Sequence, residues 1–262
     1  IFLEELTETA ARTWSFFNSK LPIGTTSIRT ARLTVAFFAM GAFGAVSAFD
    51  LVDSPHDLST GSAAALHTDA ADGTDQTCVF CHTPHDATTS TQGPLWNRAY
   101  TPAGFTEYDV TVSPTFDGGV ITLGAQTYSC MSCHDGSLAL DNLVNYPGAG
   151  TETWVAPGVY AFVDPLGRLD ANNNLANGPA ALSTDLTDDH PVGFAYATSQ
   201  GADPEINPAP AWAVLFGGYV ECATCHDVHD QDGGGPGFDA GYEMFLRQTT
   251  DQSAICTDCH NK

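Results

Sequence analysis

The sequence predicts one domain, residues 49–262, made mostly of irregular coil with short helices and small β-hairpins. Three observations carry this prediction. Glycine and proline are frequent, at 25 and 15 of the 262 residues, and both are typical of turns. Helical periodicity is absent over most of the chain. The eight cysteines fall into four copies of one pentapeptide, Cys-x-x-Cys-His. The domain is therefore expected to organise around four short motifs rather than around long elements.

The four motifs are typical of covalent haem attachment. They are Cys78–His82, Cys130–His134, Cys222–His226 and Cys256–His260. Two cysteines at this spacing can each form a thioether to one c-type haem, and the histidine that follows is its proximal iron ligand. The expected thioether residues are Cys78, Cys81, Cys130, Cys133, Cys222, Cys225, Cys256 and Cys259, and the expected proximal ligands are His82, His134, His226 and His260. The fold class is then that of a multihaem cytochrome, with the coil packed around a row of four covalently bound haem c groups.

Two other uses of paired cysteines stay open at this stage. Eight cysteines could form disulfides, and Cys-x-x-Cys is also half of a structural zinc site. Neither use gives a reason for a histidine directly after every second cysteine, whereas haem attachment does. We therefore favour haem.

The remaining histidines are expected to be distal iron ligands. Five histidines lie outside the motifs, and we expect His56, His85, His190 and His229 to ligate, while the surroundings of His67 favour ligation less. His85 and His229 each lie three residues beyond a proximal histidine. From there they reach an adjacent haem more easily than their own, which would couple neighbouring haems. Met131 and Met244 are expected to pack in the core, so all four irons should be bis-histidine ligated and low-spin.

Residues 27–48 are typical of a secretory signal peptide. Arg29 and Arg32 precede the uncharged apolar stretch Leu33–Val46, and the segment ends in a small-x-small pattern that suits cleavage after Ala48. The apolar stretch is shorter than the ~20 residues of a membrane-spanning helix. Residues 1–26 are expected to be non-translated or a leader extension, which leaves 49–262 as a single tetrahaem domain.

Within that domain four short elements are expected. Residues 109–112 and 120–123 flank a glycine-containing turn and predict a β-hairpin. Residues 154–163 predict a further short strand. Short helices are expected over residues 137–144 and 242–247, after two of the motifs.

The charge of the domain restricts its partners. Residues 49–262 keep 28 of the 31 acidic residues but only four basic ones, for a formal charge of −24. The four are Arg98, Arg168, Arg247 and Lys262. Such a chain repels nucleic acid and anionic membrane surfaces, and no segment is apolar enough to span a bilayer. We expect no nucleic-acid partner and no membrane span, and we expect the carboxylates to lower haem potentials.

Several runs around the motifs resemble extracellular multihaem cytochromes of metal-reducing microbes. They are Cys78–His85, His56-Asp57-Leu58-Ser59, Cys130–Ser137 and His190-Pro191-Val192-Gly193. With four motifs and this length, the chain most resembles the OmcE-type tetrahaem cytochromes, whose subunits polymerise into filaments known as cytochrome nanowires. The resemblance implies a bis-histidine haem row that continues across subunit contacts, where a histidine of one subunit ligates a haem of the next. His56 or His67 would take that role here.

The expected function is extracellular electron transfer by hopping along four closely stacked haems, as a filament subunit with redox partners, outside the cell or on its surface. Under this hypothesis the protein is not an enzyme. A soluble periplasmic electron shuttle is the main alternative. A multihaem reductase is a weaker one, because it needs an iron without a distal ligand. Residues 170–174 and 230–232 could hold Ca²⁺ through their oxygen atoms, although a solvated polar turn explains them better.

Overall fold

The computed structural model describes residues 51–71, 73–88, 93–100, 104–146, 160–229 and 245–261. Contacts divide the chain into two units, Ile1–Ala48 and Phe49–Lys262, and all described residues belong to the second. The leader and signal-peptide predictions lie outside the described residues. No helix in the described part is both long and apolar enough to cross a membrane.

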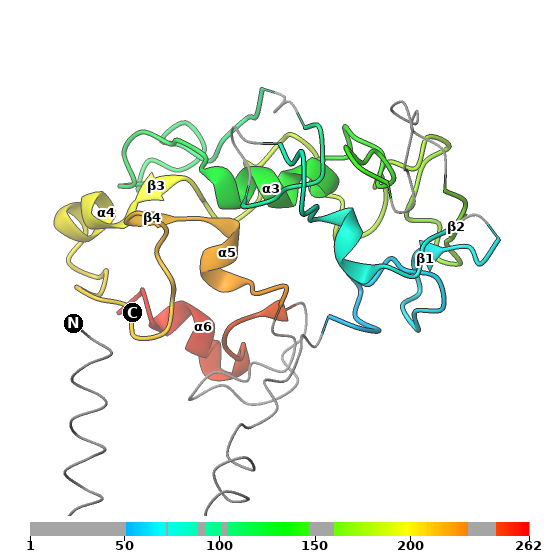
Figure 1. The fold of residues 1–262 in the computed structure, drawn as a ribbon. Helices are drawn as coiled ribbons and strands as arrows, with labels where there is room; N and C mark the ends of the chain where they lie inside the picture. The colour runs from blue at the N-terminus through cyan, green and yellow to red at the C-terminus, as the bar shows by residue number, and fades with distance from the viewer. Residues whose placement is uncertain are drawn as a thin grey trace, which may run out of the picture. The chain divides into compact units, whose positions relative to one another are not determined.

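The described residues are mostly coil, with short helices and very short strands (Figure 1). The helices are η1 (Thr77–Phe80), α3 (Ala125–His134), α4 (Tyr196–Ala202), α5 (Cys222–Cys225), η3 (Asp251–Ser253) and α6 (Ala254–Thr257). Only α3, with ten residues, exceeds two helical turns among them. Short helices leave many backbone groups to be bonded by other segments, and this requirement shapes the fold.

Two antiparallel ladders join segments that lie far apart in the sequence. Strand β1 (His67–Thr68) pairs with β2 (Phe162–Val163), with His67 opposite Val163. Strand β3 (Phe194–Ala195) pairs with β4 (Tyr219–Val220), with Phe194 opposite Val220. The ladders therefore tie the chain together over long loops.

Three small hydrophobic clusters form the core. The first contains Leu58, Leu66, Phe80, Leu140, Leu143, Tyr160 and Leu175; the second Tyr100, Leu123, Met131 and Leu186; the third Phe194, Tyr196 and Val220. Met131 is fully buried, as expected for a packing role, and Met244 lies outside the described residues. Each cluster is small, so apolar burial is divided among separate sites rather than gathered in one core.

The predicted β-hairpin over 109–112 and 120–123 is wrong. The Asp109 carboxylate accepts bonds from the backbone amide and hydroxyl of Thr111, and the Asp109 carbonyl accepts one from the amide of Val112. Local bonds of this kind compete with strand pairing. Val110 and Val112 are 59% and 40% exposed, so residues 109–112 bury neither valine, and Leu123 packs in the second cluster instead.

The predicted helix over residues 137–144 is also wrong. The helix lies before and through the second motif, as α3, and Gly136 with φ +70° follows its end. The Asp135 carboxylate then accepts bonds from the amide and hydroxyl of Ser137. That arrangement replaces a helical start with a turn.

The other two predicted elements lie only partly in the described residues. Of the expected strand over 154–163, residues 154–159 lie outside them, and β2 (Phe162–Val163) forms at its end. Of the expected helix over 242–247, residues 242–244 lie outside. Phe245 and Leu246 instead pair with the residues after α5, where His226 bridges to Leu246.

Candidate haem-attachment sites

Each attachment motif lies on a helical turn that brings its histidine back over its first cysteine. In the first motif the His82 amide donates to the Cys78 carbonyl at 2.8 Å. The equivalent distances are 3.1 Å from His226 to Cys222 and 2.9 Å from His260 to Cys256. The second motif forms the end of α3. Two cysteines and a histidine within one helical turn can face the same planar group.

All eight cysteines lie in the described residues, and each is a free thiol. No disulfide therefore occupies them in this structure. Within the described part, no group of three or more histidine, cysteine or acidic residues gathers to hold a metal ion. A zinc site would need four such ligands together, whereas a haem iron takes only two from the protein.

Three of the four motif histidines face a histidine from outside the motifs. The ring centroids of His56 and His134 are 6.0 Å apart, those of His82 and His229 are 6.0 Å apart, and those of His190 and His260 are 6.3 Å apart. Two imidazoles on opposite sides of one metal ion, with metal–nitrogen bonds of about 2 Å, place their ring centroids roughly 6 Å apart. The observed separations match that requirement.

Several of these rings are held through Nδ1. The Nδ1 atoms of His82, His134 and His190 lie 3.0, 2.6 and 3.0 Å from the carbonyl oxygens of Pro94, Ala180 and Pro191. A carbonyl can only accept, so Nδ1 carries the proton and Nε2 keeps its lone pair. Metal-binding histidines commonly show this arrangement, because the second bond fixes both tautomer and ring orientation.

Burial favours the neutral form of the His56, His134 and His82 rings. It lowers the pKa of His56 to about 3, with smaller contributions from neighbouring histidines such as His134. Burial also lowers the pKa values of His134 and His82, although the carbonyl bonds at their Nδ1 atoms act in the opposite direction. A neutral imidazole is the form that binds iron.

Buried polar atoms without partners gather near the first two motifs. Among the described residues, Nδ1 of His56, Nε1 of Trp96 and Nε of Arg98 are buried and have no hydrogen-bond partner. The Trp96 ring lies 5.6 Å from the ring of His82. Haem carries carboxylate side groups, which would accept bonds from such donors. With the free thiols and the paired imidazoles, these residues fit a covalently bound haem at the motifs.

The first and second motifs are joined by two adjacent buried residues. Asn97 and Arg98 are both fully buried. The Asn97 side chain donates to the Val79 carbonyl at 2.7 Å, inside the first motif. The Arg98 guanidinium donates to the Ser132 carbonyl at 2.8 Å, inside the second, and to the carbonyls of Ala139 and Leu140. Within the described part Arg98 has no carboxylate at ion-pair distance; the ion pair found there joins Arg247 and Asp227.

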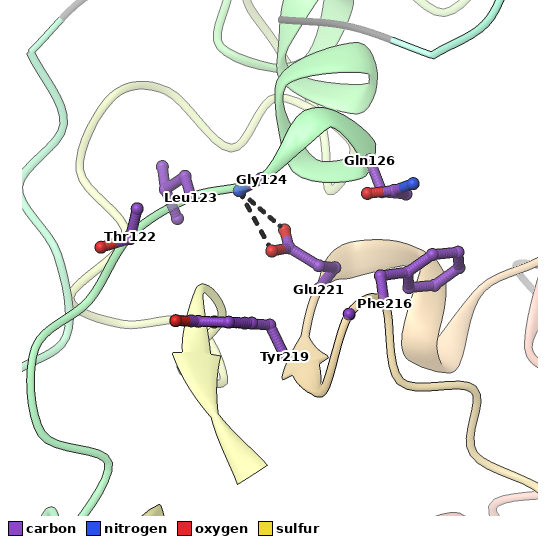
Figure 2. A pocket seen from close by; sticks show the side chains of 8 residues that line it. Thr122, Leu123, Gly124, Gln126, Phe216, Tyr219 and Glu221 are labelled. Carbon is purple, nitrogen blue, oxygen red and sulfur yellow. Dashed lines mark hydrogen bonds between the residues drawn. The ribbon is translucent and has the colours of Figure 1, made fainter.

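Buried Glu221 joins the second and third motifs. Its carboxylate accepts bonds from the Gly124 amide at 3.0 and 3.2 Å and from the Thr127 hydroxyl, at the start of α3 (Figure 2). Glu221 also caps α5 through a reciprocal pair of bonds with Thr224. The two helices pack together, as Figure 1 shows for α3 in green and α5 in orange.

The thiols of neighbouring motifs also approach one another. A hydrogen bond from Cys130 to Cys222 raises the pKa of the Cys130 thiol. Cys81 and Cys133 pack against the same hydrophobic cluster, and burial raises the pKa of Cys81 to about 12. The cysteines are the edges at which haems would attach, so haems on successive motifs would lie close together.

The pocket in Figure 2 is separate from the paired histidines and the thiols. Its lining residues are Thr122, Leu123, Gly124, Gln126, Phe216, Gly217, Tyr219 and Glu221. None of the predicted ligands lines it. Glu221 is the residue that connects the pocket to the motifs.

Two histidines and the predicted calcium-binding residues do not belong to these ring pairs. His85 is exposed, and neither it nor His67 forms a ring contact with a described residue. The Nδ1 atom of His67 is bonded to the Ala64 carbonyl at 2.7 Å. The Asp170 carboxylate accepts bonds from the amides of Asn172 and Asn174, as a polar turn would. Residues 230–232 lie outside the described residues.

Sequence reasoning missed Asn97, Arg98 and Glu221. One signal was available for Arg98, since it is one of only four basic residues after position 48. A cation retained in so acidic a chain points to a specific contact. No comparable signal marks Asn97 or Glu221.

Comparison with known proteins finds no family model and no curated protein that matches this chain. The candidate sites rest on the motifs and on the geometry around them.

Proposed function

We propose that this protein is an electron-transfer protein, not an enzyme, which binds four haem c groups covalently and passes electrons along them. The observation that carries this proposal is the pairing of motif histidines with second histidines at 6.0–6.3 Å in three of four motifs. Bound haem would supply reversible one-electron chemistry at iron. The chain supplies thiols for attachment, two imidazoles per iron, and fixed spacing between sites.

From the ring pairs we infer three distal ligands. His229 would lie opposite His82, His56 opposite His134, and His190 opposite His260. The fourth follows by reciprocity. His229 lies three residues beyond His226 and faces the first motif, so His85, three residues beyond His82, would serve the third motif opposite His226. The first and third sites would then exchange ligands.

This arrangement favours electron transfer over a reductase. A reductase needs an iron that substrate can reach, and two histidines held at each iron would leave no position for substrate. The residues that hold the imidazole rings in place also disfavour a reductase. Carbonyl bonds to the Nδ1 atoms of His82 and His134 fix both imidazoles, so ligands would not leave easily.

We further propose that the protein is exported and assembles into an extracellular filament, with a periplasmic shuttle as the alternative. The resemblance around the motifs supports assembly. If one distal ligand comes from a neighbouring subunit, His67 is the candidate, and it would then take the position at the third motif that is otherwise assigned to His85. His56 already faces His134 within the chain, whereas His67 has a fixed Nδ1 and no ring partner among the described residues.

Haem content and ligation test the first part. The exported protein should carry four haems by intact mass and by pyridine haemochrome absorbance. Its ferric electron paramagnetic resonance (EPR) spectrum should be low-spin, and the ferrous form should not bind carbon monoxide rapidly without denaturant. A protein without covalent haem would refute the proposal, and stoichiometric carbon monoxide binding would favour a reductase.

Electron microscopy of secreted material tests assembly. Filaments are expected from the wild type, and His67→Ala should abolish them if that residue ligates across subunits. In contrast, His85→Ala should open one iron in the isolated subunit. Only monodisperse small particles from the wild type would favour the shuttle.

A further inference from the structure

The first, third and fourth motifs share a backbone contact that their sequences do not reveal. In each, a residue from a remote segment donates its backbone amide to the carbonyl of the second cysteine. The donors are Asn97 to Cys81, Arg247 to Cys225 and Asn207 to Cys259, each at 2.8 Å. These three residues precede or follow their motifs at unrelated distances in the sequence.

The side chain of the same residue makes a second contact. Nδ2 of Asn97 donates to the Val79 carbonyl at 2.7 Å, Nε of Arg247 to the Ala223 carbonyl at 2.9 Å, and Nδ2 of Asn207 to the Thr257 carbonyl at 3.0 Å. Each accepting residue directly follows the first cysteine of its motif. One remote residue therefore binds two carbonyls of each motif.

The segment before each donor completes the contact. The residue after the motif histidine donates its amide to the carbonyl two positions before the donor: Thr83 to Leu95, Asp227 to Phe245 and Asn261 to Glu205, at 2.7–2.8 Å. The motif histidine itself forms an antiparallel bridge with the residue between. The bridges are His82–Trp96, His226–Leu246 and His260–Ile206. The two backbone bonds at each site constitute this bridge, so three equivalent hydrogen bonds recur at three sites, and we refer to each set as a clamp.

Helix length explains where the clamps occur. In a continuing helix, the residue after the histidine would donate to the carbonyl that follows the first cysteine. In the second motif it does so, from Asp135 to Met131 at 3.1 Å, because α3 has ten residues. In the other motifs the helices have four residues, and that amide is used in the clamp. The carbonyl of the residue after the first cysteine is then left without a helical partner, and the side chain of the remote residue donates a hydrogen bond to it.

We propose that Asn97, Arg247 and Asn207 are positioning residues that set the orientation of the proximal histidine at the first, third and fourth haem. This inference rests on the proposed haem-binding function. The clamps hold the backbone on both sides of the histidine, so they fix the direction from which its imidazole would meet iron. At the first site the same segment also holds the ring, through the Pro94 carbonyl on Nδ1 of His82.

The test is Asn207→Ala in the exported, haem-loaded protein. Asn207 is only half-buried, and its side chain donates to the carbonyls of Thr257 and Asp258, both within the fourth motif. The variant keeps its backbone amide bond to Cys259. Four haems should still attach, while the low-spin EPR signal of one haem changes its g-values and the other three stay as in the wild type. Asn207→Asp should change the same signal more, because carboxylate oxygens would face carbonyl oxygens.

The matched control is Asn177→Ala. Asn177 is an exposed asparagine whose side chain donates to the Gly167 carbonyl at 3.1 Å, in a loop without a motif. It should leave all four signals unchanged. Asn97→Ala should alter a different signal from that altered by Asn207→Ala.

Two results would overturn the inference. One is a set of four signals and four potentials in Asn207→Ala identical to the wild type. The other is loss of all four haems in that variant, which would show a global rather than a local role. Absence of haem from the wild type would refute the proposed function instead, so the two failures are distinguishable.

Discussion

Removal of the Glu221 carboxylate should loosen the junction between the second and third motifs. In Glu221→Ala, α5 loses its cap, at a cost of about 1 kcal/mol. The amide of Gly124 and the hydroxyl of Thr127 also lose their acceptor, and buried donors without partners cost about 1–3 kcal/mol. The expected loss in the free energy of unfolding is therefore about 3 kcal/mol. For a chain of this size, that corresponds to a melting temperature lower by about 10 °C.

Thermal unfolding of the haem-loaded protein, followed by circular dichroism in the Soret region, measures this loss. Glu221→Gln keeps one acceptor oxygen and should lose roughly half as much stability. Asp117→Ala is the control, because Asp117 is an exposed acidic residue in a loop. Equal melting temperatures for Glu221→Ala and Asp117→Ala would refute the assignment of Glu221 as the connection between α3 and α5.

Three further perturbations test other contacts. His229→Ala should open the iron opposite His82 and allow one carbon monoxide per protein to bind the ferrous form; no binding would show that this ring pair does not ligate. Burial, followed by the neighbouring charge of Asp109, raises the pKa of Glu107. An acid with a raised folded-state pKa destabilises the fold once pH exceeds both of its pKa values, so Glu107→Gln should raise the urea midpoint at pH 7 and leave it unchanged at pH 3. The Asp258 carboxylate accepts hydrogen bonds from three backbone amides at 2.7–3.1 Å. Asp258→Ala should therefore lower the free energy of unfolding by about 2 kcal/mol, measured by the same thermal unfolding. A change within the error of the Asp117→Ala control would show that these bonds contribute little.

Haem attachment at the motifs stays a prediction, and it rests on a local pattern. Two cysteines and a histidine within five residues carry the pattern regardless of the surrounding fold. Candidates for the second histidines could also be named from the sequence, because only five histidines lie outside the motifs. Which histidines meet was not predictable, because the contact between His82 and His229 depends on long-range folding.

The errors in secondary structure have a common physical cause. At 109–112 and 135–137, the carboxylates of Asp109 and Asp135 bind nearby amides and replace regular pairing with turns. Secondary-structure propensities and the alternation of apolar and polar residues do not reveal this competition between side chains and strand pairing. In a chain with so many acidic residues and no large core, such local bonds decide the backbone path.

The clamps were hidden from sequence analysis for a different reason. The motifs start 52, 92 and 34 residues apart, and this irregular spacing gives no sign of an internal repeat. The clamps nevertheless repeat in space. Their donors follow the first and third motifs in the sequence and precede the fourth. The second motif needs none, because α3 is long enough to satisfy its own carbonyls. A search for sequence repeats cannot find an equivalence of backbone bonds.

Arg98 places a buried cation where the first two motifs meet. Its guanidinium is fully buried, and its hydrogen bonds to the described residues go to neutral carbonyls. Residues 49–262 carry a formal charge of −24. An electron on the proposed haem row would be repelled at every site by the carboxylates, with partial screening by salt. Near Arg98 it would also be attracted by a fixed cation in a medium that screens charge poorly. The Asp135 carboxylate, which is also buried beside the second motif, would oppose that attraction, so the energy of the electron would vary along the row rather than stay uniform.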